Sequence, residues 1–207
     1  MKDISILKSQ SYSVSKWSGG KTKELYIFPK SSSYREKNFD FRLSSATVSL
    51  LETNFSDLRG YHRLIMTLDR SMSLFNVETH EITKLNPFET FSFEGCDKIK
   101  SYGQCTDINL IYNDNYLGQM EAVHKTTSSI CSSMTTQMVY TLCDITCTVD
   151  GQRAYLLKTN HLLVIQNGSP SPHNKLELSP LKPCSKVIAI WAGLSYKKDS
   201  GYMIKGS

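Results

Sequence analysis

Polar side chains that could bind a small acid recur two residues apart in two segments of the chain. Arg42 and Ser44 stand in the segment FDFRLSSA, and Asp107 and Asn109 stand in the segment TDINLIY. Alternate residues of a β-strand project to one face, so each pair is expected opposite its hydrophobic neighbours. A guanidinium matches a carboxylate at two points, and an asparagine amide both donates and accepts hydrogen bonds. If the two faces line a barrel interior, they predict a site for a small polar acid.

Each of these residues also has a purely structural interpretation. Arg42 could pair with Asp107 or Glu24 inside the barrel without any ligand, because buried charges are normally paired. Ser44 and Asn109 could close backbone hydrogen bonds at the ends of strands. The sequence leaves both interpretations open.

The segment KWSGGKTKELYIFP, residues 16–29, contains Gly-Gly-Lys-Thr and raises the question of a phosphate-binding loop. The motif GxxxxGK[ST] needs a glycine at position 15, which is Ser15, and it needs a helix after the loop. The residues that follow alternate as in a strand and end at a proline. The segment therefore predicts a tight glycine turn that feeds a strand, with Thr22 and Glu24 on one face.

Alternation with a period of two dominates the chain from residue 12 onward and predicts strands. It is clearest at 39–44, 63–68 and 107–110, and Asp150-Gly151 indicates a two-residue hairpin turn. Further strands are expected in HLLVIQ and KVIAIWA, and no helix of three turns is indicated. Segment 117–136 is the least regular, and is expected to be a passage between two barrels or a long loop with a turn of helix. The predicted fold class is all-β, a barrel or sandwich.

The composition excludes several classes of protein. The 207 residues carry 24 basic and 19 acidic side chains, a net charge of +5 that is scattered rather than clustered, which argues against nucleic acid as a partner. No apolar stretch has the length of a signal peptide or a membrane span, so we expect a cytoplasmic protein with no membrane contact. The six cysteines lack the short spacing of zinc sites and are expected to be buried thiols.

Five fragments carry a resemblance to one protein family. They are WSGGKTKELYIFP, FDFRLSSATV, FSDLRGYHR, FSFEG and DINLI, in this order between Trp17 and Ile111. The ordered set resembles the HutD (Ves) family of bicupin proteins, in which a Trp-Gly-Gly-Thr-Glu opening, an FxFRxSxA strand, an FSxxxGxxR element and a DFN-type segment recur. The chain departs from this pattern at Ile108, where Phe is common, and at Leu68-Asp69-Arg70, where the family has a Leu-x-Gly turn.

The resemblance implies a bicupin fold, with two double-stranded β-helix (jelly-roll) barrels in one chain. The barrels are expected at 1–116 and 117–207, with terminal strands that could be shared. The family is encoded in many bacteria near histidine-utilisation genes, which implies a regulatory, non-enzymatic role in binding a small acidic metabolite of that pathway. Formylated or formiminated glutamate and urocanate are the expected ligands. Exposed strand edges make a homodimer reasonable.

The sequence and the resemblance together define a set of candidate ligand-binding residues: Trp17, Thr22, Glu24, Arg42, Ser44, His62, Arg63, Asp107 and Asn109. Three of them have further structural interpretations. Trp17 could belong to the core, Arg63 could face solvent at the start of a strand, and His62 could be a surface or hydrogen-bonded histidine.

No cofactor is expected. Cupin enzymes usually hold a transition metal with two closely spaced histidines, a carboxylate and a third histidine. This chain has five histidines and no His-x-His pair, which argues against such a site. Two other functions remain open: a cupin enzyme that uses His62 or Asp107 as acid or base, and a barrel filled by its own side chains without a ligand.

Overall fold

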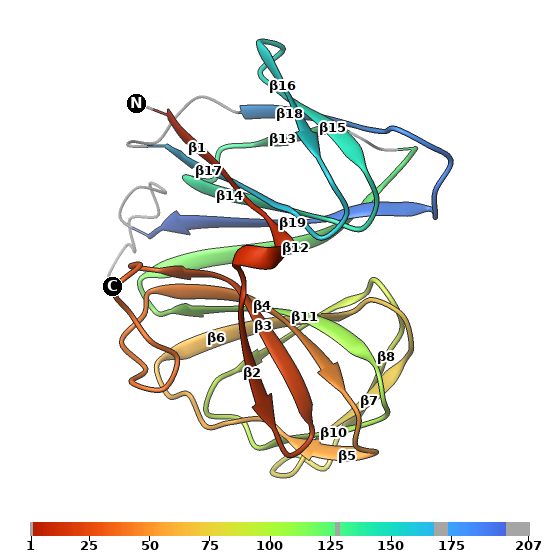
Figure 1. The fold of residues 1–207 in the computed structure, drawn as a ribbon. Coiled ribbons are helices and arrows are strands. Elements are labelled where there is room, and N and C mark those ends of the chain that lie inside the picture. The colour runs from red at the N-terminus through yellow and green to blue at the C-terminus, as the bar shows by residue number, and fades with distance from the viewer. Residues whose placement is uncertain (1, 127–128, 168–173, 198–207) are drawn as a thin grey trace, which may run out of the picture. The chain divides into compact units, whose positions relative to one another are not determined.

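The protein consists of two compact units, seen in a computed structural model that describes residues 2–126, 129–167 and 174–197. Unit 1 comprises Met1–Ser11 and Asn115–Ser207, and unit 2 comprises Tyr12–Asp114. Each unit is built of two antiparallel sheets (Figure 1). The expected all-β fold is confirmed. In the described ranges, no helix has the length and hydropathy needed to cross a bilayer.

Unit 2 contains a six-stranded sheet and a four-stranded sheet. The strands of the larger sheet, in spatial order, are β2 (Ser13–Trp17), β3 (Gly20–Phe28), β4 (Phe41–Val48), β11 (Thr106–Asn113), β6 (Tyr61–Thr67) and β9 (Thr90–Glu94). Those of the smaller sheet are β5 (Glu52–Asn54), β10 (Ile99–Tyr102), β7 (Met72–Asn76) and β8 (Ile82–Leu85). The strands predicted around residues 42, 64 and 108 are therefore adjacent members of the larger sheet.

Unit 1 has the same two-sheet construction. Its five-stranded sheet runs in the order β1 (Lys2–Leu7), β17 (Leu162–Asn167), β14 (Thr136–Thr141), β19 (Val187–Tyr196) and β12 (Tyr116–His124). Its four-stranded sheet runs in the order β13 (Ser129–Ser132), β18 (Asn174–Pro180), β15 (Ile145–Val149) and β16 (Arg153–Leu157). A short 3-10 helix, η1 (Ser9–Ser11), follows β1.

Two sequence expectations for unit 1 differ from the structure. The first eleven residues belong to unit 1 and not to a continuous barrel of 1–116, because β1 pairs with β17 from Lys2 opposite Asn167 to Leu7 opposite Leu162. Residues 117–136 were expected to be a passage between two barrels or a long loop with a turn of helix, but their described part forms most of β12, β13 and the start of β14. The polar and small residues there obscured the strand pattern.

Aliphatic side chains fill the interior of unit 1. Val139, Leu163, Ile165 and Ile188 are completely buried in one cluster with residues from both sheets. Trp191 belongs to this cluster, and its indole donates a hydrogen bond to the buried side chain of Gln137, at 3.1 Å. Such packing fills this part of the unit 1 interior with aliphatic side chains.

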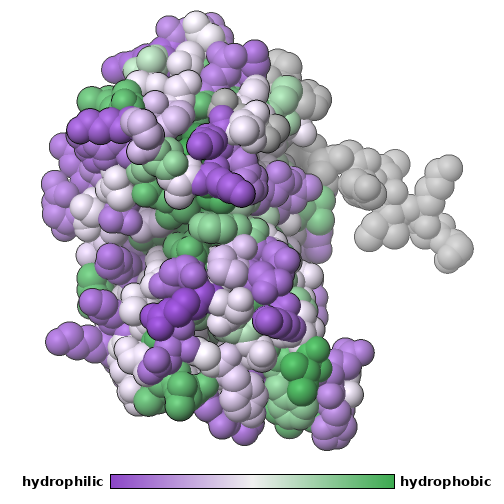
Figure 2. Space-filling view, turned by 90° about the vertical axis from the view of Figure 1, so that its right-hand side faces the viewer, coloured by the Kyte–Doolittle hydropathy of each residue, from purple (hydrophilic) through white to green (hydrophobic). Residues whose placement is uncertain are grey.

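The surface carries exposed hydrophobic residues in separate places. In the face drawn in Figure 2, the hydrophobic patches are interrupted by hydrophilic residues. Leu51 and Ile82, each more than two thirds exposed, stand on loops or edge strands of unit 2. Single exposed apolar residues of this kind are normal for a globular protein.

The turns confirm two predictions from glycine spacing. Asp150 and Gly151, with φ of 53° and 67°, are the central residues of the hairpin turn between β15 and β16, whose connection has three residues because Val149 pairs with Arg153. Gly19 and Gly20 belong to the turn between β2 and β3, where Trp17 pairs with Gly20. A strand, not a helix, follows this turn, so the segment is not a phosphate-binding loop.

Replacing Gly20 with Ala is expected to destabilise unit 2 by roughly 2 kcal/mol or more. A Cβ at this position would lie 2.0 Å from the backbone oxygen of Thr47, so β3 and β4 would have to separate. Urea unfolding measures the effect, with Ser18→Ala as a control in the same exposed turn. Equal stability of the two variants would contradict the close approach of these strands.

Candidate functional site

A cavity of about 310 Å³ lies between the two sheets of unit 2. Its floor is one face of β3, β4, β11 and β6 in the larger sheet. The opposite wall includes Thr53 of β5, Ser101 of β10 and Met72 of β7 in the smaller sheet. The interior of this unit is therefore hollow and partly polar.

Strand register places the polar residues of the floor in three rows across the sheet. Each row takes one residue from β4, one from β11 and one from β6: Arg42, Ile111 and Arg63; Ser44, Asn109 and Ile65; Ala46, Asp107 and Thr67. A period of two puts all these positions on the same face. The two arginines thus stand on strands that flank β11, with backbones about 10 Å apart.

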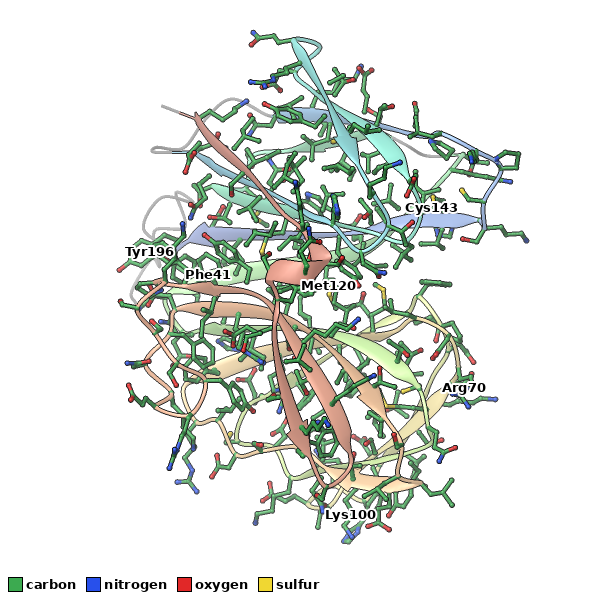
Figure 3. The ribbon with its side chains drawn as sticks, in the orientation of Figure 1. Phe41, Arg70, Lys100, Met120, Cys143 and Tyr196 are labelled. Atoms are coloured by element: carbon green, nitrogen blue, oxygen red, sulfur yellow. The ribbon has the colours of Figure 1, made fainter. Side chains whose placement is uncertain are left out.

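Strand β3 continues two of these rows. Thr22 pairs with Ala46 and Glu24 pairs with Ser44, so both share the face of the cavity floor, and the register of β3 against β4 shifts only after Glu24, before Tyr26. Beyond the bulge, Tyr26 and Phe28 stack on Phe41 of β4 on the other face of the sheet. Phe41 is labelled among the side chains of Figure 3. Glu24 thereby becomes a neighbour of Arg42.

Arg42 is buried, with 6% of its surface exposed, and its guanidinium donates two hydrogen bonds to side chains. Its Nε donates to Glu24 at 2.7 Å, and its Nη1 donates to the Ser44 hydroxyl at 3.0 Å. Its guanidinium also lies 4.4 Å from the ring centre of Tyr34. The charge of Arg42 is therefore largely balanced by Glu24, as one structural interpretation of the sequence had it.

Arg63 is buried to the same degree, at 5% exposed, but lacks such a partner. Its guanidinium lies 4.7 Å from the ring centre of Phe55 and 5.0 Å from that of Phe93. Its one described hydrogen bond runs from Nη1 to the backbone oxygen of Ser56, at 3.4 Å. Within the described ranges no carboxylate forms an ion pair with it, and its Nε has no hydrogen-bond partner. The alternative interpretation, in which Arg63 faces solvent, is wrong.

The charge of the cavity depends on the pKa values of Arg63 and Asp107. Burial lowers the pKa of Arg63 to about 10, while Tyr34 and Asp107 oppose that change and Arg42 adds to it. Burial also raises the pKa of Asp107 to about 7, against the Ala46 backbone N–H and Arg63, which stabilise the carboxylate. Near neutral pH, Asp107 therefore neutralises Arg63 only in part. The cavity carries excess positive charge.

The middle of the floor contains an unused acceptor. The Asn109 side chain is 7% exposed and lines the cavity, and its Oδ1 has no hydrogen-bond partner among the described residues. A buried polar atom without a partner is costly and is rare in folded proteins. Asn109 Oδ1 and Arg63 Nε are thus an acceptor and a donor left open on the same wall.

The structure brings seven of the nine sequence candidates to the cavity wall. They are Trp17, Thr22, Arg42, Ser44, Arg63, Asp107 and Asn109. Glu24 lies next to them through its ion pair with Arg42. Trp17 is 39% exposed and is held by a hydrogen bond from its indole to the Thr22 hydroxyl, at 3.2 Å, so it is not a core residue.

His62 is not among the residues that line this cavity. It neighbours Arg63 on β6 and therefore projects to the opposite face of the sheet. Its Nδ1 lies 2.9 Å from Glu94 and its Nε2 lies 3.0 Å from Asp114. The interpretation of His62 as a hydrogen-bonded histidine agrees with this position.

Two aromatic residues at the site were missed or misread in the sequence. Tyr34 comes from the segment between β3 and β4, where no alternation marks a face, and Phe55, which follows β5, also packs against the core cluster of Ile65 and Phe93. Both lie under a guanidinium, in the stacked arrangement that arginine favours. Each arginine contacts an aromatic residue that is distant in the sequence, so no local sequence pattern predicts the contact.

The donor set of the cavity does not fit a metal of the usual cupin type. Its floor presents arginine, serine, asparagine and one aspartate, with no imidazole. In the part of the chain that the structure describes, no group of three or more His, Cys, Asp or Glu side chains could hold a metal ion. His173 lies outside the described residues.

Comparison with known structures supports the fold. A conserved protein of unknown function from Pseudomonas aeruginosa PAO1 has a TM-score of 0.78 at 22% identity, over 93% of this chain and 99% of that chain. HutD from Pseudomonas fluorescens SBW25 has a TM-score of 0.73 at 22% identity, over 94% of this chain and 100% of that one. The oxalate decarboxylase of Lactobacillus farciminis has a TM-score of 0.58 at 6% identity, over 91% and 85%. The bicupin fold predicted from sequence is confirmed.

Sequence comparison identifies the family. No curated protein matches the chain at a significant level. The HutD family profile matches residues 9–181, which include both units and extend well beyond the segment in which the motifs were found. The chain belongs to the HutD family.

Proposed function

We propose that the protein is a non-enzymatic binding protein that holds a small organic acid in the cavity of unit 2. The observation that carries this proposal is Arg63, a buried cation without an ion-pair partner in the described ranges. Buried charges are normally paired, because an isolated ion in a low dielectric is strongly destabilised. A carboxylate bound in the cavity would supply the missing charge.

The charges around Arg63 favour an anion over a neutral or cationic ligand. Arg42 and Glu24 form a pair that is neutral as a whole. Asp107 is about half protonated near pH 7 and leaves part of the Arg63 charge unbalanced. The stacking of each guanidinium on an aromatic ring fixes the plane of its fork before a ligand arrives.

The biological role proposed here is to modulate histidine utilisation in the cytoplasm through this binding. Family membership supports the role, and the charge of the cavity supports acidic ligands. Formylated glutamate, formiminated glutamate and urocanate each carry at least one carboxylate and are the compounds to test. Fold alone does not establish the ligand, so the proposal depends on direct binding.

A thermal-shift titration with these three acids tests the function. At a hundredfold excess over Kd, the true ligand is expected to add about 2.7 kcal/mol of stability, or roughly 5 to 10 °C in Tm. The shift should fall in Arg42→Ala and persist in Lys100→Ala, which alters a cation of β10 paired with Glu52 away from the cavity wall. The absence of any shift with all three acids would leave the proposal without support.

One observation favours a second candidate function, a metal-free enzyme acting on the same acids. Asp107 has a pKa of about 7 and lines the cavity, as a general acid or base requires. His62, the other candidate from the sequence, projects away from the cavity and is not part of this proposal. Conversion of a bound acid followed by NMR distinguishes the two functions, since a binding protein returns the acid unchanged.

A further inference from the structure

A donor and an acceptor of residues that line the unit 2 cavity have no hydrogen-bond partner among the described residues, and a ligand that matches both would satisfy them. The donor is Arg63 Nε on β6, and the acceptor is Asn109 Oδ1 on β11. Both side chains are more than nine-tenths buried and line the cavity. Because β6 and β11 are adjacent strands, one small molecule can contact both groups.

Several polar groups nearby already have partners, whereas the Thr67 hydroxyl, in the row of Asp107, has none among the described residues. Arg42 donates to Glu24 and to the hydroxyl of Ser44, which is the row neighbour of Asn109 on β4. The Asp107 carboxyl accepts from the backbone N–H of Ala46. Asp107 and Asn109 project side by side from β11, so the acceptor oxygen of Asn109 lies next to a carboxyl group.

We infer that the ligand carries an N–H or O–H donor near its carboxylate, and that Asn109 is the residue that selects for this donor. The inference rests on the proposed acid-binding function, because it assigns the carboxylate to Arg63. A simple carboxylate would satisfy Arg63 and leave Asn109 Oδ1 buried without a partner. A ligand such as an N-acylated amino acid satisfies both groups, since its amide N–H lies two bonds from the carbon that bears the carboxylate.

Two small acids isolate the effect of the donor. N-acetylglycine and 4-oxopentanoate have the same chain length and the same terminal carboxylate, and they differ by NH in place of CH2. Polar groups of a site reject a ligand that leaves them unpaired far more strongly than they reject a small change in apolar volume. N-acetylglycine is therefore expected to bind at least about tenfold more tightly in an NMR titration of the unaltered protein.

A variant of similar volume assigns the preference to Asn109. In Asn109→Leu the acceptor is lost, so the affinity for N-acetylglycine is expected to fall to that of 4-oxopentanoate, which should change little. N-acetylsarcosine, in which a methyl group replaces the amide hydrogen, supplies the same comparison on the unaltered protein if this variant does not fold. N-acetylsarcosine is expected to bind as weakly as 4-oxopentanoate.

The possible outcomes separate the inference from the function on which it rests. Equal binding of N-acetylglycine and 4-oxopentanoate, or a preference for the latter, would overturn the role of Asn109 and leave the acid-binding cavity intact. Binding of neither acid would overturn both. A preference for N-acetylglycine that survives in a folded Asn109→Leu variant would assign the selection to another residue and overturn the inference.

Discussion

Replacing Arg63 with Met is expected to weaken binding of the acid by at least about thirtyfold, without loss of stability in the free protein. Removal of one partner from a buried, hydrogen-bonded charge pair costs about 2 to 5 kcal/mol of binding energy, or roughly thirtyfold to several thousandfold in Kd. In the free protein Arg63 has no described ion-pair partner, so its removal relieves a desolvated charge. The cation–π energy lost with Phe55 and Phe93 is small compared with the cost of the desolvated charge. The Met side chain retains most of the packing against the two rings.

Calorimetric titration measures the affinity for the acid, and urea unfolding measures the stability of the free protein, on the same protein samples. Arg59→Met is the matched control, because that arginine is largely exposed in the same unit and lies near Asp57. Arg63→Lys keeps the charge but loses the planar fork, so its affinity is expected between those of the wild type and Arg63→Met. Unchanged affinity in Arg63→Met would show that the acid is bound elsewhere.

Replacing Asp107 with Asn is expected to abolish a large part of the pH dependence of stability. The fold raises the pKa of Asp107 from 3.8 to about 7, so the folded protein binds this proton more tightly than the unfolded chain does. The stability contributed by the neutral carboxyl is therefore lost as pH rises from about 4 to 7. The loss amounts to about 4 kcal/mol, at 1.36 kcal/mol for each pH unit of the shift.

The Asn side chain imitates the neutral carboxyl at every pH. The unfolding free energy of the variant, relative to that of the wild type, should therefore rise by up to about 4 kcal/mol between pH 4 and pH 8. The charges of Arg63 and Asp69 shift the pKa of Asp107, and the charge of Arg42 shifts that of Arg63. All three residues are present in both proteins, so they contribute little to the difference in unfolding free energy between the variant and the wild type. Urea unfolding across the pH range measures the difference. Asp57→Asn, a change of an exposed carboxylate, should show a nearly constant difference from the wild type, and the same flat result for Asp107→Asn would contradict the assignment.

The sequence predicted the elements of the site well, because they lie on regular strands. A period of two was enough to place Arg42 and Ser44 on one face of β4, and Asp107 and Asn109 on one face of β11. The same argument placed Thr22 and Glu24 together on β3. For these residues, one local rule fixes the direction of the side chain.

The features of the site that the sequence did not predict depend on which strands pair with one another. The choice of Glu24 over Asp107 as the partner of Arg42 depends on the register of β3 against β4, and the lack of an ion-pair partner for Arg63 depends on which strands become neighbours. Tyr34 reaches the site from a segment without periodicity. Strand β1 joins unit 1 by pairing with β17, about 160 residues away, and no local pattern reports such a partner.

The NMR signal of the Arg63 Nε–H group during titration with an acid tests most directly whether this buried cation holds the ligand. In the free protein this N–H has no described partner, so its hydrogen is expected to resonate like that of an unbonded donor. Binding of a carboxylate should shift the signal strongly and with the same midpoint as the thermal-shift titration. A signal that stays unchanged at saturation with the bound acid would contradict the assignment of the carboxylate to Arg63.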